Sequence, residues 1–147
     1  MKPFTFSLRK IRDYKDQLLE KQQALLASLR HELYLIEQRL VALYEYRAEK
    51  EELLLQRQRE GITVSDACAL QTLIEAAKQQ AERLEAEREK AESAVQRQLT
   101  VVVQISQEIS GLDKLEEKKR EEHRYEAAKE SAEEILEQLT QQLFRRA

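Results

Sequence analysis

Apolar residues recur at helical spacing along almost the whole chain. In the first segment they lie three, four or seven positions apart, at Ile11, Leu18, Leu25, Leu29, Leu33, Ile36, Leu40, Leu43 and Leu54. The second segment repeats the pattern at Leu70, Leu73, Ala77, Leu84, Ala91, Val95, Val102, Ile105, Ile109, Leu112, Ile135, Leu139 and Leu143. This spacing predicts an all-α chain with helices over about residues 5–59 and 65–144. Successive steps of four near Leu29 predict a repeat closer to eleven residues there.

The break between the two segments has the composition of a helix-to-helix turn. Gly61 is suited to the left-handed conformation that ends a helix, and Thr63 or Ser65 with Asp66 can cap the next one. A turn at residues 60–64 forces the helices to lie antiparallel. We therefore expect one coiled-coil domain over residues 1–147, a long antiparallel two-helix hairpin.

Because the second segment is longer, about 30 residues at its end overhang the hairpin. The overhang still carries one apolar face, which we call the tail face: Ala132, Ile135, Leu136, Leu139 and Leu143. An apolar stripe without an internal partner is expected to dock onto something else. A partner protein is one candidate, and pairing of two copies through this stripe is the other.

A second glycine interrupts the long second helix. Residues 110–113 read Ser-Gly-Leu-Asp, and glycine costs about 1 kcal/mol inside a helix. Either the helix kinks at 110–113 with Ser110 recapping it, or Gly111 leaves room for packed side chains.

Composition excludes several protein classes. The chain is 41% hydrophobic, 36% charged and 5% aromatic, and two glycines and one proline are too few for the turns of a β-sandwich or a doubly wound sheet. A net charge of −3 is unlike that of a general nucleic-acid binder. The longest uncharged stretch, residues 98–107, is half the roughly 20 residues needed to span a bilayer. With a single cysteine and no visible signal peptide, we expect a cytoplasmic protein.

Residues with potential chemistry are few and scattered. No glycine-rich phosphate loop is present, and His31 and His123 have no metal-ligand spacing. Cys68 is expected to be a small packing residue rather than a nucleophile. We therefore expect no enzyme activity, cofactor, metal or small-molecule substrate. Tyr44 and Tyr46 near the seam are either binding residues or aromatics lying along neighbouring charged side chains.

Several stretches resemble the FliJ family of bacterial flagellar protein export. Phe4, Phe6 and Leu8 match the Phe-x-Phe-x-Leu start of many FliJ proteins, and Gly61-Ile62 matches the family's turn. Residues 112–119, Leu-Asp-Lys-Leu-Glu-Glu-Lys-Lys, are similar to a family stretch that is followed by a tail rich in alanine and glutamate.

This resemblance implies a non-enzymatic stalk that inserts into the hexameric ring of the export ATPase FliI. It also implies binding to the membrane export gate protein FlhA and contacts with FliH and export chaperones, which would hold the protein at the inner face of the cell membrane at the flagellar base. On this basis the tail face is expected to bind the ATPase. The positions that match the family's gate-binding patch are Leu43, Tyr46 and Leu73.

Two alternatives to this function remain open at the level of sequence. One is the equivalent stalk of a virulence type III secretion injectisome. The other is a structural coiled coil that dimerises through its tail and has no ATPase partner.

Overall fold

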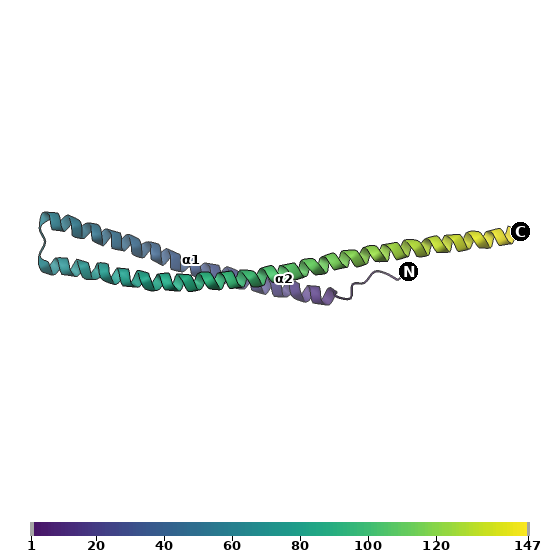
Figure 1. Ribbon diagram of the computed structural model, residues 1–147, viewed down its shortest axis with the longest axis horizontal. Helices are drawn as coiled ribbons and strands as arrows, with labels where there is room; N and C mark the ends of the chain where they lie inside the picture. The colour runs from purple at the N-terminus through teal and green to yellow at the C-terminus, as the bar shows by residue number, and fades with distance from the viewer. Residues whose placement is uncertain (1, 147) are drawn as a thin grey trace. The chain divides into compact units, whose positions relative to one another are not determined.

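The computed structural model describes residues 2–146 and contains two helices (Figure 1). Helix α1 spans Arg9–Glu60 and helix α2 spans Val64–Arg146, 52 and 83 residues long. The helices pack against each other as an antiparallel hairpin, and residues 2–146 contain no strand. The expected all-α hairpin is confirmed.

The turn between the helices uses the chemistry that its sequence suggests. Gly61 has φ of 100°, a left-handed conformation that costs other residues energy because of their Cβ atom. Thr63 caps α2: its Oγ1 accepts a hydrogen bond from the Asp66 amide at 3.2 Å, and its carbonyl accepts one from the Ala67 amide at 3.0 Å. The chain therefore reverses direction in three residues.

Two compact units make up the described chain. One comprises residues 2–20 and 103–146, and the other comprises Lys21–Val102. We refer to them as the terminal unit and the turn unit and describe each separately.

The turn unit is held by an apolar seam with a regular seven-residue repeat. Seam residues of α1 alternate in steps of three and four, and Leu26 and Leu40 are its most buried members at 6% and 3% exposure. From α2 the buried side chains are Leu70, Ile74, Ala77, Ala81 and Val95. The expected eleven-residue repeat is wrong, because Leu26 rather than Leu25 occupies the seam; Leu25 is 47% exposed. Likewise Ile74 is buried in place of Leu73.

One buried polar side chain interrupts this seam. Gln98 is 9% exposed, and its Nε2 donates to the Gln22 carbonyl oxygen at 3.0 Å and to Gln22 Oε1 at 2.7 Å. A polar pair at a seam position loses these bonds if the helices slide, so it favours one register.

The terminal unit has a thinner apolar seam supplemented by charge. Ile105 and Ile109 of α2 are buried, while the α1 positions facing this part of α2 include Arg12 and Lys15. Lys15 Nζ pairs with Glu108 Oε2 at 2.5 Å. Ion pairs thus replace part of the apolar contact here.

Helix α1 begins at Arg9, four residues later than the sequence pattern predicts. Residues 2–8 are not helical, and within them Phe4, Phe6 and Leu8 are half-buried while Thr5 and Ser7 are exposed. Alternation with period two is the property of an extended chain, whose successive side chains point to opposite sides. In a helix Phe4 and Phe6 would point in nearly opposite directions, so only the extended form brings both aromatic rings to α2.

Helix α2 runs without interruption through Gly111. A Cβ atom built on Gly111 meets nothing within 4 Å, so the expectation that this glycine makes room for a packed neighbour is wrong. The backbone there is ordinary helix, and no capping bond from Ser110 is formed.

We predict that Gly111→Ala stabilises the chain by about 0.5–1 kcal/mol, because alanine lowers the backbone entropy of the unfolded chain and fits the helix without contact. Gly61→Ala should instead destabilise it by about 1 kcal/mol, because its φ is left-handed. Thermal melts followed by circular dichroism at 222 nm compare the two variants with the parent. A lower melting temperature for Gly111→Ala than for the parent would contradict the absence of a structural role for this glycine.

Candidate partner-binding surfaces

The tail face is an apolar surface that the terminal unit leaves exposed. Every residue from 128 to 146 is exposed. On the tail face the exposed fractions are 57% for Ile135, 63% for Leu136, 51% for Leu139 and 68% for Leu143. Steps of three and four residues bring these side chains to one side of α2. Phe144, which is 79% exposed, extends the apolar surface by one residue.

The tail face does not continue the seam of the terminal unit. Twenty residues separate Leu112, on the seam, from Ala132, and at about 100° per residue this places Ala132 about 200° around the helix from Leu112. The same count from Ile109 to Leu136 gives about 180°. A partner that binds the tail face therefore approaches α2 from the side opposite to α1.

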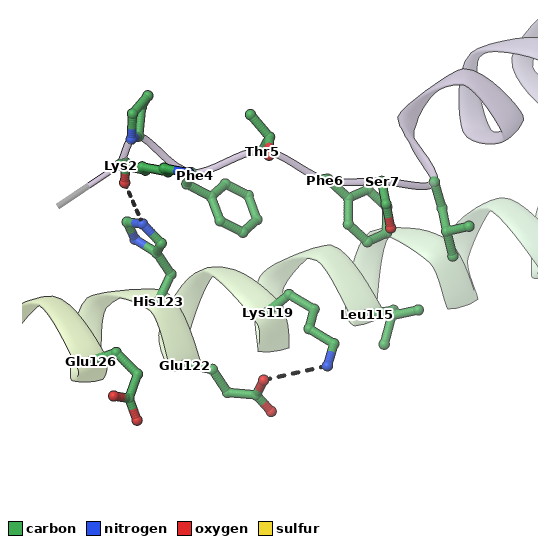
Figure 2. A pocket seen from close by; sticks show the side chains of 12 residues that line it. Lys2, Phe4, Thr5, Phe6, Ser7, Leu115, Lys119, Glu122, His123 and Glu126 are labelled. Atoms are coloured by element: carbon green, nitrogen blue, oxygen red, sulfur yellow. Dashed lines mark hydrogen bonds and ion pairs between the residues drawn. The ribbon is translucent and has the colours of Figure 1, made fainter.

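Residues 2–8, which we call the strap, cover part of α2 just before the tail. Residues 2–6 are extended, and Ser7 and Leu8 form a turn in which the Arg9 amide donates to the Phe6 carbonyl oxygen at 3.2 Å. Figure 2 shows Phe4 and Phe6 facing α2 across a cleft of about 500 Å³. The Phe4 ring meets the His123 ring edge-on at a centroid distance of 5.6 Å, and the Arg120 guanidinium lies 4.8 Å from the Phe4 centroid. His123 Nε2 lies 2.9 Å from the Lys2 carbonyl oxygen and is the donor, since a carbonyl only accepts.

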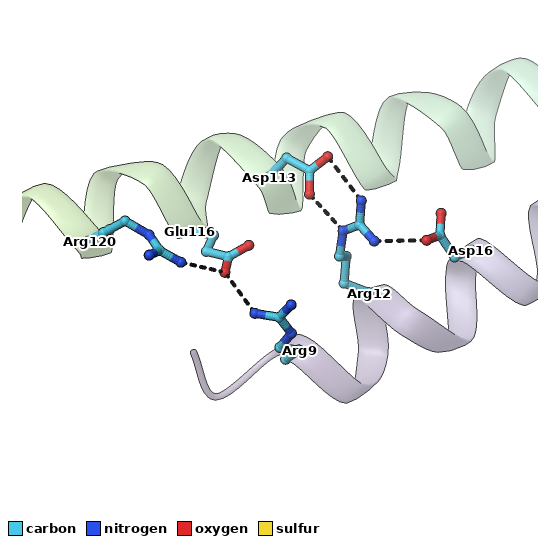
Figure 3. A network of polar contacts seen from close by, with 6 residues as sticks. All are labelled: Arg9, Arg12, Asp16, Asp113, Glu116 and Arg120. Carbon is cyan, nitrogen blue, oxygen red and sulfur yellow. Dashed lines mark hydrogen bonds and ion pairs between the residues drawn. The ribbon is translucent and has the colours of Figure 1, made fainter. Parts of the chain in front are cut away.

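An ion-pair network joins the start of α1 to α2 beside the strap (Figure 3). Arg12 pairs with Asp113 at 2.7 Å and with Asp16 at 2.8 Å. Glu116 accepts from both Arg9 and Arg120 at 3.4 Å. The hydrogen bond from Arg12 lowers the pKa of Asp113 and raises that of Arg12, because the bond favours the charged form of each.

We predict that Asp113 makes the terminal unit sensitive to acid. Since the pKa of Asp113 is lower in the folded chain than the roughly 3.9 of an unfolded one, its contribution is present above about pH 4 and is lost as the pH falls through the folded value. Asp113→Asn should therefore lower the melting temperature at pH 7, and its difference from the parent should shrink as the pH is lowered below about 4. Glu117→Gln, at an exposed position, is the control. A difference that stays constant as the pH falls would contradict this origin.

The positions matched to the family's gate-binding patch lie in the turn unit and only partly converge. Leu43 and Tyr46 line one groove of about 550 Å³ with Arg39, Ala42, Gln80, Leu84 and Glu87. Tyr46 is 38% exposed, and Lys50 Nζ lies 5.4 Å from its ring centroid. Leu73 is 43% exposed and is not among the residues that line this groove.

Tyr44 lies on the other edge of the turn unit. Its hydroxyl donates to Glu85 Oε1 at 2.5 Å, which raises the pKa of Tyr44 because the neutral phenol is the donor. Tyr44 and Tyr46 are thus both in contact with a charged neighbour, as one of the two interpretations of these tyrosines predicts.

The described residues do not form a catalytic or metal-binding site around Cys68 or the histidines. Cys68 is exposed, so the expectation that it packs against neighbours is wrong. Within residues 2–146, no three His, Cys, Asp or Glu side chains are grouped to hold a metal ion. Neither α1 nor α2, over the same residues, contains a stretch apolar and long enough to cross a bilayer.

The strap is the contact that the sequence interpretation missed. Its signal is the alternation of Phe4, Phe6 and Leu8, but a period of two over five residues is short, and the helix expected from the apolar pattern that starts at Ile11 includes residues 5–8.

Comparison with known proteins gives one match. A family model described as "Flagellar FliJ protein" matches residues 4–147. No curated protein and no solved structure matches the chain.

Proposed function

The chain belongs to the FliJ family of flagellar protein-export components, and from this premise we propose that it acts as the stalk of the type III export apparatus. The family is a non-catalytic part of this apparatus and serves motility. In the proposed role the chain binds the hexameric ring of the export ATPase FliI and the export gate FlhA. FliH and export chaperones are further proposed partners. Through them the chain would be held at the inner face of the cell membrane.

The observation that carries the ATPase assignment is the exposure of the tail face. Four large aliphatic side chains lie more than half exposed on one side of a helix, although burying each would contribute about 1.5–3 kcal/mol. Such a surface can remain exposed to water, but the free energy falls when a partner covers it. If the assembled ring binds the tail better than free ATPase subunits do, the chain shifts the equilibrium toward the ring.

The gate assignment rests on the groove beside Tyr46. Leu43 and Tyr46 share this groove with Leu84, and the aromatic ring is accessible at its edge. Tyrosine combines a large apolar area with a hydroxyl group and is enriched at binding hot spots. Leu73 enters the proposal as a contact outside the groove.

Direct binding tests the assignment of the tail. Isothermal titration of the full-length chain into FliI with a non-hydrolysable ATP analogue should show saturable binding, with one chain per ring. A chain ending at residue 127 should not bind, although its terminal unit keeps the strap and the ion pairs. Unchanged binding by the shortened chain would exclude the tail face as the ATPase site.

Self-association through the tail is the competing role of the same surface. Sedimentation at 1–100 µM distinguishes the two, since a dimer that is lost in the chain ending at residue 127 would favour a scaffold. A monomer over this range would leave the tail face free for the ATPase.

A further inference from the structure

A second apolar row follows the outer side of α1 in the turn unit. Tyr34, Val41 and Leu55 lie at multiples of seven residues and are 54%, 50% and 53% exposed. Ala48 occupies the remaining position of the row. Neither the seam nor the groove beside Tyr46 uses these residues.

The seven-residue spacing makes this row a continuous surface. The seam of α1 repeats every seven residues in this region, as Leu26, Leu33 and Leu40 show. Residues seven apart therefore keep the same orientation relative to α2 along the whole unit. The row from Tyr34 to Leu55 is accordingly a straight band about 32 Å long, parallel to the seam.

The position of this band is given by the contacts of the α1 residues that lie one helical turn after its members. Glu37, three residues after Tyr34, lies 3.6 Å from Arg88. Tyr44, three residues after Val41, bonds to Glu85. The band thus borders the side of α2 that presents Glu85 and Arg88, whereas the groove beside Tyr46 is lined by Gln80, Leu84 and Glu87.

This side of α2 has more acidic than basic residues, since its only bases are Lys78, seven residues before Glu85, and Arg88. Its carboxylates fall into two rows with seven-residue spacing: Glu75, Glu82 and Glu89 in one, Glu85 and Glu92 in the other. Glu82, Glu85, Glu89 and Glu92 line a shallow groove with Ala86 and Arg88. Arg88 is already shared among Glu37, Glu85 and Glu92 at 3.2–3.6 Å, so it neutralises only part of this charge.

We propose that this edge of the turn unit, with its apolar row on α1 and its carboxylate rows on α2, docks a basic amphipathic helix of a protein partner. The partner's apolar stripe packs on Tyr34, Val41 and Leu55, and lysine or arginine along one of its edges pairs with the carboxylates. A helix of about 20 residues matches the length of the row. The negative field disfavours nucleic acids and anionic membranes as occupants.

The proposal is independent of the stalk function, because neither the tail face nor the groove beside Tyr46 takes part. Variants of this edge should bind FliI as the parent does. If the edge binds no basic helix, the assignment of the tail face to the ATPase is unaffected. If the tail face does not bind FliI, the proposal for the edge is likewise unaffected.

A pair of labelled peptides tests the edge with the full-length chain. The first is a 21-residue helix with leucine or isoleucine on one stripe and lysine along one edge; the second has glutamate in place of lysine. By fluorescence anisotropy at about 50 mM salt we expect the lysine peptide to bind at least tenfold more tightly. The preference should shrink at about 0.5 M salt, where exposed charges are screened.

Two double variants map the binding to the edge. Tyr34→Ser/Val41→Ser should weaken the lysine peptide at least tenfold, because two half-exposed apolar side chains are lost from the contact. Glu82→Lys/Glu89→Lys should weaken it by a similar factor and strengthen the glutamate peptide, reversing the preference. The matched controls, Tyr14→Ser/Leu35→Ser and Glu32→Lys/Glu49→Lys, change exposed residues that lie off the edge and should stay within twofold of the parent.

Circular dichroism confirms that each variant keeps its helix content. Equal binding of both peptides, equal losses in the control variants, or no binding at 100 µM would overturn the proposal. So would binding of duplex DNA or phosphatidylserine vesicles that is lost in Tyr34→Ser/Val41→Ser.

Discussion

Leu136→Asp/Leu139→Asp is expected to weaken binding of the FliI ring at least a hundredfold and to stop swimming in soft agar. The two leucines are 63% and 51% exposed, so the substitutions cost little folding free energy in the isolated chain. In the complex they remove two buried apolar side chains, worth about 1.5–3 kcal/mol each, and bury two unpaired carboxylates. Titration calorimetry and a motility assay measure the two effects.

Gln138→Asp/Gln141→Asp is the matched control for this prediction. It adds the same two charges with the same spacing to exposed positions of α2 off the tail face. It should keep affinity and swimming close to the parent. Equal losses in both variants would mean that added charge, and not the apolar face, is responsible.

Leu40→Ala is expected to lower the free energy of unfolding by about 2–4 kcal/mol. Leu40 is 3% exposed, the most buried side chain of the described chain, and its truncation removes apolar contact and leaves a cavity between α1 and α2. Urea unfolding monitored at 222 nm gives the change.

Leu35→Ala serves as the reference for Leu40→Ala. Leu35 is five residues away in the same helix and 42% exposed, so its truncation should change stability by less than about 0.5 kcal/mol. Similar losses at the two positions would contradict the seam as the source of stability in the turn unit.

The hairpin could be predicted from sequence because local and long-range signals agree. Gly61 adopts the left-handed conformation and Thr63 caps α2, and both have a purely local cause. The all-α architecture followed from the helical period of the apolar residues.

The errors came from positions where several apolar residues are adjacent. Leu25 and Leu26 are neighbours, and periodicity alone does not decide which faces α2; packing against the second helix selects Leu26. In the same way Leu73 and Ile74 are neighbours of similar size, and only packing against α1 selects Ile74 as the buried one. The strap was missed because its extended form depends on contacts with Arg120 and His123, more than a hundred residues away.

The tail face was predicted as an apolar stripe without an internal partner, and its exposure is confirmed; the structure adds that it is rotated away from the seam. The identity of its partner is not encoded in the stripe itself, since apolar surface is non-directional and fits many partners. The family match supplies the flagellar export apparatus as the setting and favours it over an injectisome.

ATP hydrolysis by FliI, measured over a range of FliI concentrations with and without the chain, tests the stalk function most directly. We predict that the chain raises activity at low FliI concentration, where the ring is sparsely populated, and that the increase disappears with Leu136→Asp/Leu139→Asp but not with Gln138→Asp/Gln141→Asp. No increase at any ratio, with a chain that is helical by circular dichroism, would contradict the proposed stalk.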